Sequence, residues 1–125
     1  MYSCHEINTD DIRNYCIALN GHTDEYYLSP DDASTSAHFL LTAPDFENSR
    51  AVGAFFGIKL VGYCIVHRVY DSVILDLIHV HPDFRGKKVG SLLVDHVKPT
   101  EVCVVAKNNV ALSLYRKYGL TIEFT

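Results

Sequence analysis

The sequence contains no tryptophan and none of the short patterns that mark common metal sites. Its four cysteines are scattered without a CxxC pair, and its seven histidines form no HxxxH or HExxH pattern. Structural zinc sites draw their ligands from such closely spaced pairs. We therefore expect buried free thiols, no disulfide and no metal. Cys64 and Cys103 already lie inside apolar runs, VGYCIV and EVCVVA.

The chain also lacks an apolar run long enough to cross a membrane, and its start, MYSCHEIN, has neither the basic nor the apolar region of a signal peptide. We expect an intracellular, cytoplasmic protein with no membrane partner. Positive charge is scarce, since 11 Lys and Arg stand against 15 Asp and Glu, for a net charge of -4. A general nucleic-acid binder needs a basic stripe, so we expect no nucleic-acid partner. The acidic balance suits a small cationic substrate.

What the sequence has is the composition of a folded protein, with 48% hydrophobic and 21% charged residues in a chain of 125. This length supports one hydrophobic core, so we expect a single domain over residues 1–125. The first 50 residues predict a strand at 2–7 and a helix at 8–21, capped by Asn8 or Thr9. The Ser-Pro-Asp-Asp run from Ser29 predicts the start of a second helix.

Beyond residue 50, β-branched and aromatic residues dominate, and three runs predict an antiparallel meander over 51–56, 59–69 and 72–80. The segment GSLLVDHV then predicts a helix, EVCVVA a strand buried on both faces, and NVALSLYRKYG a last helix before a short final strand. The order β-α-α-β-β-β-α-β-α-β indicates an α/β fold. Its mixed central sheet should carry helices on both faces, with a last strand that is short or missing.

One stretch, HVHPDFRGKKVGSLL, concentrates positive charge and glycine between the last strand of the meander and the next helix. A helix N-terminus offers unpaired N–H groups and a partial positive charge, and glycine lets phosphate oxygens approach the backbone. Neither GxGxxG nor the P-loop pattern occurs, which argues against a dinucleotide or P-loop site. The stretch predicts a cradle for a polyanionic ligand, with an ordinary basic turn as the alternative.

The same stretch closely resembles the acetyl-CoA loop of the GNAT N-acetyltransferases, V-x-P-x-Y/F-R-G-x-G-I/V-G. The matching positions are Val80, Pro82, Phe84, Arg85, Gly86, Val89 and Gly90. Lys88 stands where the family usually has glycine, and we expect it to serve if its backbone is helical. The segment NNVALSLYRKYGL resembles the family's N-x-x-A-x-x-L-Y-x-K-x-G-F. The family usually ends with one more long strand, so we expect an open sheet edge or a homodimer that covers it.

The resemblance implies an enzyme in which an amine attacks the thioester of acetyl-CoA directly, without a metal. It implies that coenzyme A is bound by backbone groups of Ile78, His79 and Val80. It extends the coenzyme site to the loop, the helix start and the last helix: Arg85, Gly86, Lys87, Lys88, Val89, Gly90, Ser91, Asn108 and Tyr115. Tyr115 would protonate the departing thiolate, although its spacing alone indicates a packing residue. Asn108 either contacts the pantetheine chain or caps its helix.

The acceptor amine needs a group that removes its proton, because only the neutral form attacks. Asp76 interrupts the apolar run VILDLIHV, where an unpaired carboxylate is costly. It either faces a wet cleft or forms a structural pair with Arg68 or Lys59. His79 and His81 could also act as bases. A regular strand would place His79 on the face opposite Asp76, and a bulge would change this.

Glu25, in TDEYYLSPDD, resembles the Tyr-adjacent Glu of the diamine (spermidine/spermine) acetyltransferases, and Asp76 resembles their acidic residue on the fourth strand. The alternative for Glu25 is a solvated loop charge. The resemblance thus implies acetylation of a small polyamine or diamine, such as spermidine or putrescine, by Glu25, Asp76 and Tyr115. So compact a chain would also suit a viral genome. Lysine acetylation of a histone or other protein, and a non-catalytic acyl-CoA-binding sensor, remain as alternatives.

Overall fold

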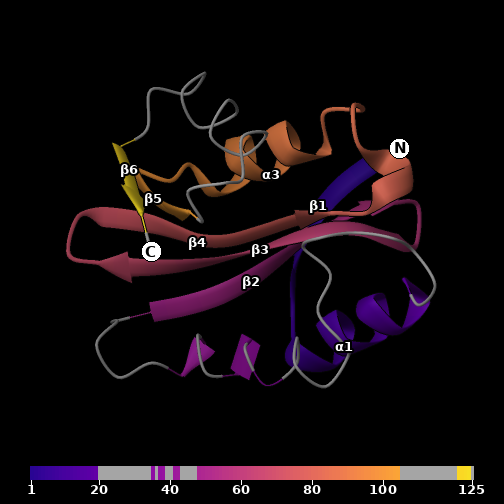
Figure 1. Ribbon diagram of the computed structural model, residues 1–125, viewed down its shortest axis with the longest axis horizontal. Helices are drawn as coiled ribbons and strands as arrows, with labels where there is room; N and C mark the ends of the chain where they lie inside the picture. The colour runs from indigo at the N-terminus through magenta and orange to yellow at the C-terminus, as the bar shows by residue number, and fades with distance from the viewer. Residues whose placement is uncertain (20–34, 36, 39–40, 43–47, 105–120, 125) are drawn as a thin grey trace.

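The computed structural model of the chain describes residues 1–19, 35, 37–38, 41–42, 48–104 and 121–124 (Figure 1). Its elements are β1 (Tyr2–Ile7), α1 (Thr9–Ala18), β2 (Asn48–Phe56), β3 (Lys59–Val69), β4 (Ser72–Val80), the 3-10 helix η1 (Pro82–Phe84), α3 (Val89–Val97), β5 (Glu101–Val104) and β6 (Thr121–Phe124). The strands predicted at 2–7, 59–69 and 72–80 have these bounds. Four residues of the second predicted helix, Thr35, Ala37, His38 and Leu41, are helical. The last predicted helix lies outside the described residues.

The strands form one six-stranded mixed sheet in the order β1-β2-β3-β4-β5-β6. Strands β1 to β4 are each antiparallel to the next, whereas β5 is parallel to β4 and β6 is parallel to β5. The predicted α/β fold with a mixed sheet is therefore confirmed. The last strand, β6, is short, with four residues.

Helices α1 and α3 cover opposite faces of the sheet, as Figure 1 shows with α3 above and α1 below. On the α3 face, Leu93 and Val97 pack with β-sheet residues such as Cys64. On the α1 face, Ile12 and Tyr15 pack in a second cluster with sheet residues. Burial raises the pKa of the Cys64 thiol to about 12, so it stays protonated as a buried, unreactive side chain. Among the described residues, no helix is long and apolar enough to span a membrane.

Helix α1 begins at a reciprocal cap that involves Asn8 and Asp11. The Asn8 side chain accepts a hydrogen bond from the Asp11 amide at 2.9 Å, and the Asp11 carboxylate accepts one from the Asn8 amide at 3.0 Å. Asn8, rather than Thr9, is therefore the cap. The cap fixes where the helix starts, and Tyr15 then falls on the buried face toward the sheet.

Candidate active site

Strand β4 leaves β5 after two paired residues. Ile74 pairs with Glu101 and Leu75 with Val102, and β4 then continues beyond this pairing to its end at Val80. On the opposite side, the His81 amide donates to the Val61 carbonyl of β3 at 2.8 Å. Main-chain groups alternate in direction along a strand.

The alternation places the main chain of His79 toward β3, on the same side as that of His81. This differs from the expectation that the His79 amide faces a coenzyme. The main-chain groups of Ile78 and Val80 point to the other edge, where β4 has left β5. That edge can accept an extended ligand as an added strand.

The loop that follows β4 contains two residues with left-handed backbone. Gly86 has φ 75°, and no atom lies within 4 Å of the position that a Cβ would take. Lys88 has φ 66° and ψ 22°. An L side chain in this region costs about 1–2 kcal/mol, whereas glycine adopts it freely. The right-handed helical backbone that was the condition for Lys88 to replace glycine is therefore not present. The left-handed geometry explains why the family pattern has glycine at this position.

Helix α3 begins without a side-chain cap, because Lys88 is its N-cap residue and makes no capping hydrogen bond. The first bond within the helix runs from the Leu92 amide to the Lys88 carbonyl at 3.0 Å. The amides of Val89 and Gly90 precede this bond and so have no partner inside the helix. Such a helix start is suited to an anionic group, above all a phosphate.

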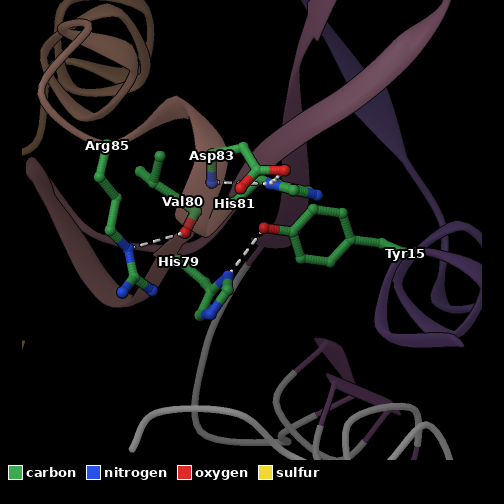
Figure 2. Close-up of polar contacts among 6 residues, drawn as sticks. All are labelled: Tyr15, His79, Val80, His81, Asp83 and Arg85. Atoms are coloured by element: carbon green, nitrogen blue, oxygen red, sulfur yellow. Dashed lines mark hydrogen bonds and ion pairs between the residues drawn. The ribbon is translucent and has the colours of Figure 1, made fainter. Parts of the chain in front are cut away.

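Three cationic side chains belong to the loop directly before this helix start. The side chains of Arg85, Lys87 and Lys88 are exposed. The Arg85 Nε donates to the Val80 carbonyl at 3.2 Å, which fixes its guanidinium beside the edge of β4 (Figure 2). The Lys87 Nζ lies 5.3 Å from the centroid of the Phe84 ring. The loop therefore combines main-chain donors with full positive charges.

Asp76 is the extra residue of a β-bulge. Ile65 of β3 pairs with Leu77 and the next residue, Val66, pairs with Leu75, so Asp76 has no opposite partner. Its Oδ2 lies 2.7 Å from Nε2 of His67, a side chain that is 1% exposed, while Asp76 is 25% exposed. The partner of Asp76 is thus His67, and neither of the two cations considered from the sequence. One of these, Lys59, instead lies over the Phe84 ring at 5.4 Å.

The bulge also decides which β4 side chains share a face. Leu75 packs in the α3-side cluster, whereas Leu77 packs in the α1-side cluster. Asp76 contacts His67, which lies two residues after Ile65 of the α1-side cluster. Asp76 and His79 therefore both lie on the α1 face, although a regular strand would have separated them.

The side chain of His79 contacts helix α1 directly. Its Nδ1 lies 2.8 Å from the buried Tyr15 hydroxyl, as Figure 2 shows. Tyr63 packs edge-on against Tyr15 with ring centroids 5.5 Å apart, and burial raises the pKa of the Tyr63 phenol, so it stays protonated. Sequence reasoning missed Tyr15 because its partner is 64 residues away along the chain.

His81 closes β4 and caps the turn that leads into the loop. It is 4% exposed, and its Nδ1 accepts a hydrogen bond from the Asp83 amide at 3.1 Å (Figure 2). The sequence placed His81 in the loop and offered it as a base, and the structure gives it a capping contact. Glu25, Asn108 and Tyr115 lie outside the described residues. In the part of the chain that is described, no group of three or more His, Cys, Asp or Glu could hold a metal ion.

Residues 47–121 match the acetyltransferase (GNAT) domain. No curated protein matches the sequence. Similar solved structures include the ribosomal-protein-S18-alanine N-acetyltransferase from Escherichia coli, with TM-score 0.67, 18% identity and coverage of 95% of this chain and 77% of that chain. A second similar structure is PaiA N-acetyltransferase from Thermoplasma acidophilum in complex with coenzyme A. It has TM-score 0.63, 17% identity and coverage of 94% of this chain and 88% of that chain.

A third similar structure is AAC(6')-Iy in complex with the bisubstrate analog CoA-S-monomethyl-acetylneamine, with TM-score 0.63, 17% identity and coverage of 96% of this chain and 90% of that chain. At such identities these likenesses show the fold, whereas the domain match extends over more than half of the chain. A β4 edge that departs from β5 and a helix start open to phosphate fit the coenzyme of that family. The chain belongs to the GNAT acetyltransferases and is an acetyl-CoA-dependent N-acetyltransferase.

Proposed function

We propose that this enzyme transfers the acetyl group to a primary amine of a small polyamine or diamine, such as spermidine or putrescine, and that residues 1–125 act as one catalytic domain. The Asp76 carboxylate on the α1 face of β4 is the observation that carries the proposal. It is partly exposed and lies on the strand whose far edge is open. A carboxylate there, in a chain with a net charge of -4, attracts a cationic amine.

Acetyl-CoA supplies the activated acetyl group when it is bound. In the proposed arrangement Ile78 and Val80 pair with the pantetheine and thioester carbonyl through their main chain. The pyrophosphate is held by Arg85, Gly86, Lys87, Lys88, Val89, Gly90 and Ser91. Asn108 contacts the pantetheine chain. This assignment is supported by the left-handed Gly86, the uncapped start of α3 and the exposed cations.

The protonation state of the amine sets what the acidic residues must do. An alkylammonium with a pKa of about 10.4 is only about 0.04% neutral at pH 7. A carboxylate that merely pairs with the ammonium would stabilise the unreactive form. We therefore give two carboxylates separate tasks: Asp76 accepts the proton of the reacting nitrogen, and Glu25 holds the distant charge. Tyr115 donates a proton to the departing thiolate.

A thiol-release assay with acetyl-CoA tests this proposal over four acceptors: spermidine, putrescine, a histone-tail peptide and an aminoglycoside. We expect the two polyamines to be acetylated with the highest kcat/KM. A preference for the peptide would instead indicate a lysine acetyltransferase. If calorimetry detects acetyl-CoA binding but no acceptor releases thiol, the chain would be an acyl-CoA-binding sensor and the proposal would fail.

A further inference from the structure

We propose that Ser49 and His67 are positioning residues that hold the Asp76 carboxylate in place for the acceptor amine. This inference rests on the proposed role of Asp76 as the base. The three side chains form a hydrogen-bonded chain across β2, β3 and β4, with 2.8 Å from Ser49 Oγ to His67 Nδ1 and 2.7 Å from His67 Nε2 to Asp76 Oδ2.

The strand register makes this chain of contacts possible. Ser49 and His67 are direct cross-strand partners, and His67 in turn lies opposite Ile74. Because Asp76 follows Ile74 by two residues, its side chain lies on the same face, diagonal to His67. The bulge begins at this point and frees Asp76 from a partner directly opposite. The carboxylate is therefore placed by the imidazole and not by a cross-strand neighbour.

The chemistry of the three groups fixes the direction of one hydrogen bond. An ionised carboxylate only accepts, so His67 Nε2 carries a hydrogen and donates to Asp76 in either protonation state of the imidazole. The ring cannot turn without also breaking the contact between Nδ1 and Ser49. His67 is 1% exposed, so water does not readily replace it as a donor. His67 thus binds Oδ2, and we assign the transfer of the amine proton to Oδ1 of Asp76, whose side chain is 25% exposed.

Two amide substitutions separate positioning from simple packing, because each reproduces one ring nitrogen. The side-chain nitrogen of H67Q can occupy the place of Nε2 and donate to Asp76, whereas that of H67N can occupy only the place of Nδ1. We expect H67N to lower kcat/KM for the best polyamine about 100-fold, chiefly through kcat, because a displaced catalytic group loses its alignment. H67Q should recover most of this loss. Acetyl-CoA affinity should stay at the wild-type value in both variants.

Matched variants control for the removal of a side chain as such. S49A removes the contact that holds Nδ1, so the imidazole can turn. The kcat/KM of S49A for the best polyamine should lie between those of the wild type and H67N. S72A removes another cross-strand hydroxyl contact, that of Ser72 to Glu101 at 3.3 Å, and H5N changes an exposed imidazole of β1. Both controls should retain wild-type kinetics. Thermal unfolding of each variant shows whether it is folded at the assay temperature.

A spectroscopic measurement tests the geometry without any substrate. Long-range proton–nitrogen NMR spectra of the wild type should show His67 with a proton on Nε2, and this signal should shift in D76N. A neutral His67 with its proton on Nδ1 alone would overturn the inference. So would folded H67N with wild-type kcat, or folded H67Q as impaired as H67N. Wild-type kinetics in D76N would instead overturn the proposed role of Asp76, so the two failures are distinguishable.

Discussion

The two sides of the end of β4 are built in different ways. On the α3 side, the proposed coenzyme loop consists of consecutive residues from Val80 to Gly90, and its key features are backbone angles and helix-start amides. On the α1 side, Asp76 contacts His67 of β3, which in turn contacts Ser49 of β2, and His79 contacts Tyr15 of α1. The first side is encoded locally, whereas the second exists only once the strands have the correct register.

This difference implies that each side can be damaged separately. A substitution in the loop should change acetyl-CoA binding and leave the chemistry of the amine intact. A substitution on the α1 face should do the reverse, because it alters side-chain contacts that the coenzyme edge does not use. The predictions below test that separation.

The largest effect is expected from D76N, which removes the proposed base and keeps the shape of the side chain. We expect kcat/KM for the polyamine to fall about 10²–10⁴-fold, the range typical of a positioned proton acceptor. Steady-state thiol release gives the rate and calorimetry gives the acetyl-CoA affinity, which should be unchanged. D95N, an exposed carboxylate of α3, is the control. Weaker acetyl-CoA binding by D76N with unchanged amine kinetics would assign Asp76 to the coenzyme side.

The next effect is expected from Y115F, which removes the proposed proton donor to the thiolate. We expect kcat to fall roughly 10- to 1,000-fold. This range overlaps the lower part of the roughly 10²–10⁴-fold contribution that is typical of a general acid. Single-turnover measurements should show a slower chemical step with both ligands still bound at wild-type affinity. Wild-type turnover would mean that another group, or water, protonates the thiolate.

A smaller effect on the coenzyme side is expected from G86A. Gly86 and Gly57 both have positive φ, at 75° and 63°, with open space where a Cβ would lie. Both G86A and G57A should therefore lower the free energy of unfolding by about 1 kcal/mol. Only G86A should weaken acetyl-CoA binding, by about tenfold, because a side chain there obstructs the approach of phosphate. If G86A and G57A bound acetyl-CoA with equal affinity, Gly86 would not be part of the coenzyme site.

The smallest effect is expected from K88G and K98G. Lys88 and Lys98 stand at opposite ends of α3, and both have left-handed backbone, with φ 66° and 49°. Glycine relieves this strain but adds freedom to the unfolded chain, so each variant should gain only about 0.5 kcal/mol. Calorimetry at low and high salt should show weaker acetyl-CoA binding for K88G alone, and mainly at low salt. The same loss in K98G would mean that charge acts at long range rather than at the loop.

The fold could be predicted from the sequence wherever one segment carries its own pattern. Alternating and β-branched runs predicted the bounds of β1, β3 and β4, and the Gly, Lys and Arg residues after β4 marked the turn that precedes α3. The left-handed backbone of Lys88 was not predicted, since a lysine gives no sign of it and the turn before α3 imposes it.

The acceptor side was predicted less completely, because its contacts join distant segments. Asp76 was found as a charged residue in an apolar run, and His67 interrupts the run CIVHRV in the same way, but the sequence does not pair them. Their pairing depends on a bulge that cross-strand packing selects. The contact between Tyr15 and His79 spans a helix and a strand, and no local pattern indicates it.

Amide chemical-shift mapping with acetyl-CoA tests most directly whether the coenzyme lies along the open edge of β4 and the start of α3. We predict that the amides of Ile78, Val80, Val89 and Gly90 shift on titration, while the imidazole of His67 and the carboxylate of Asp76 respond only when a polyamine is added. Saturable binding of acetyl-CoA that leaves those four amides unmoved would contradict the assignment of the coenzyme to this side of the sheet.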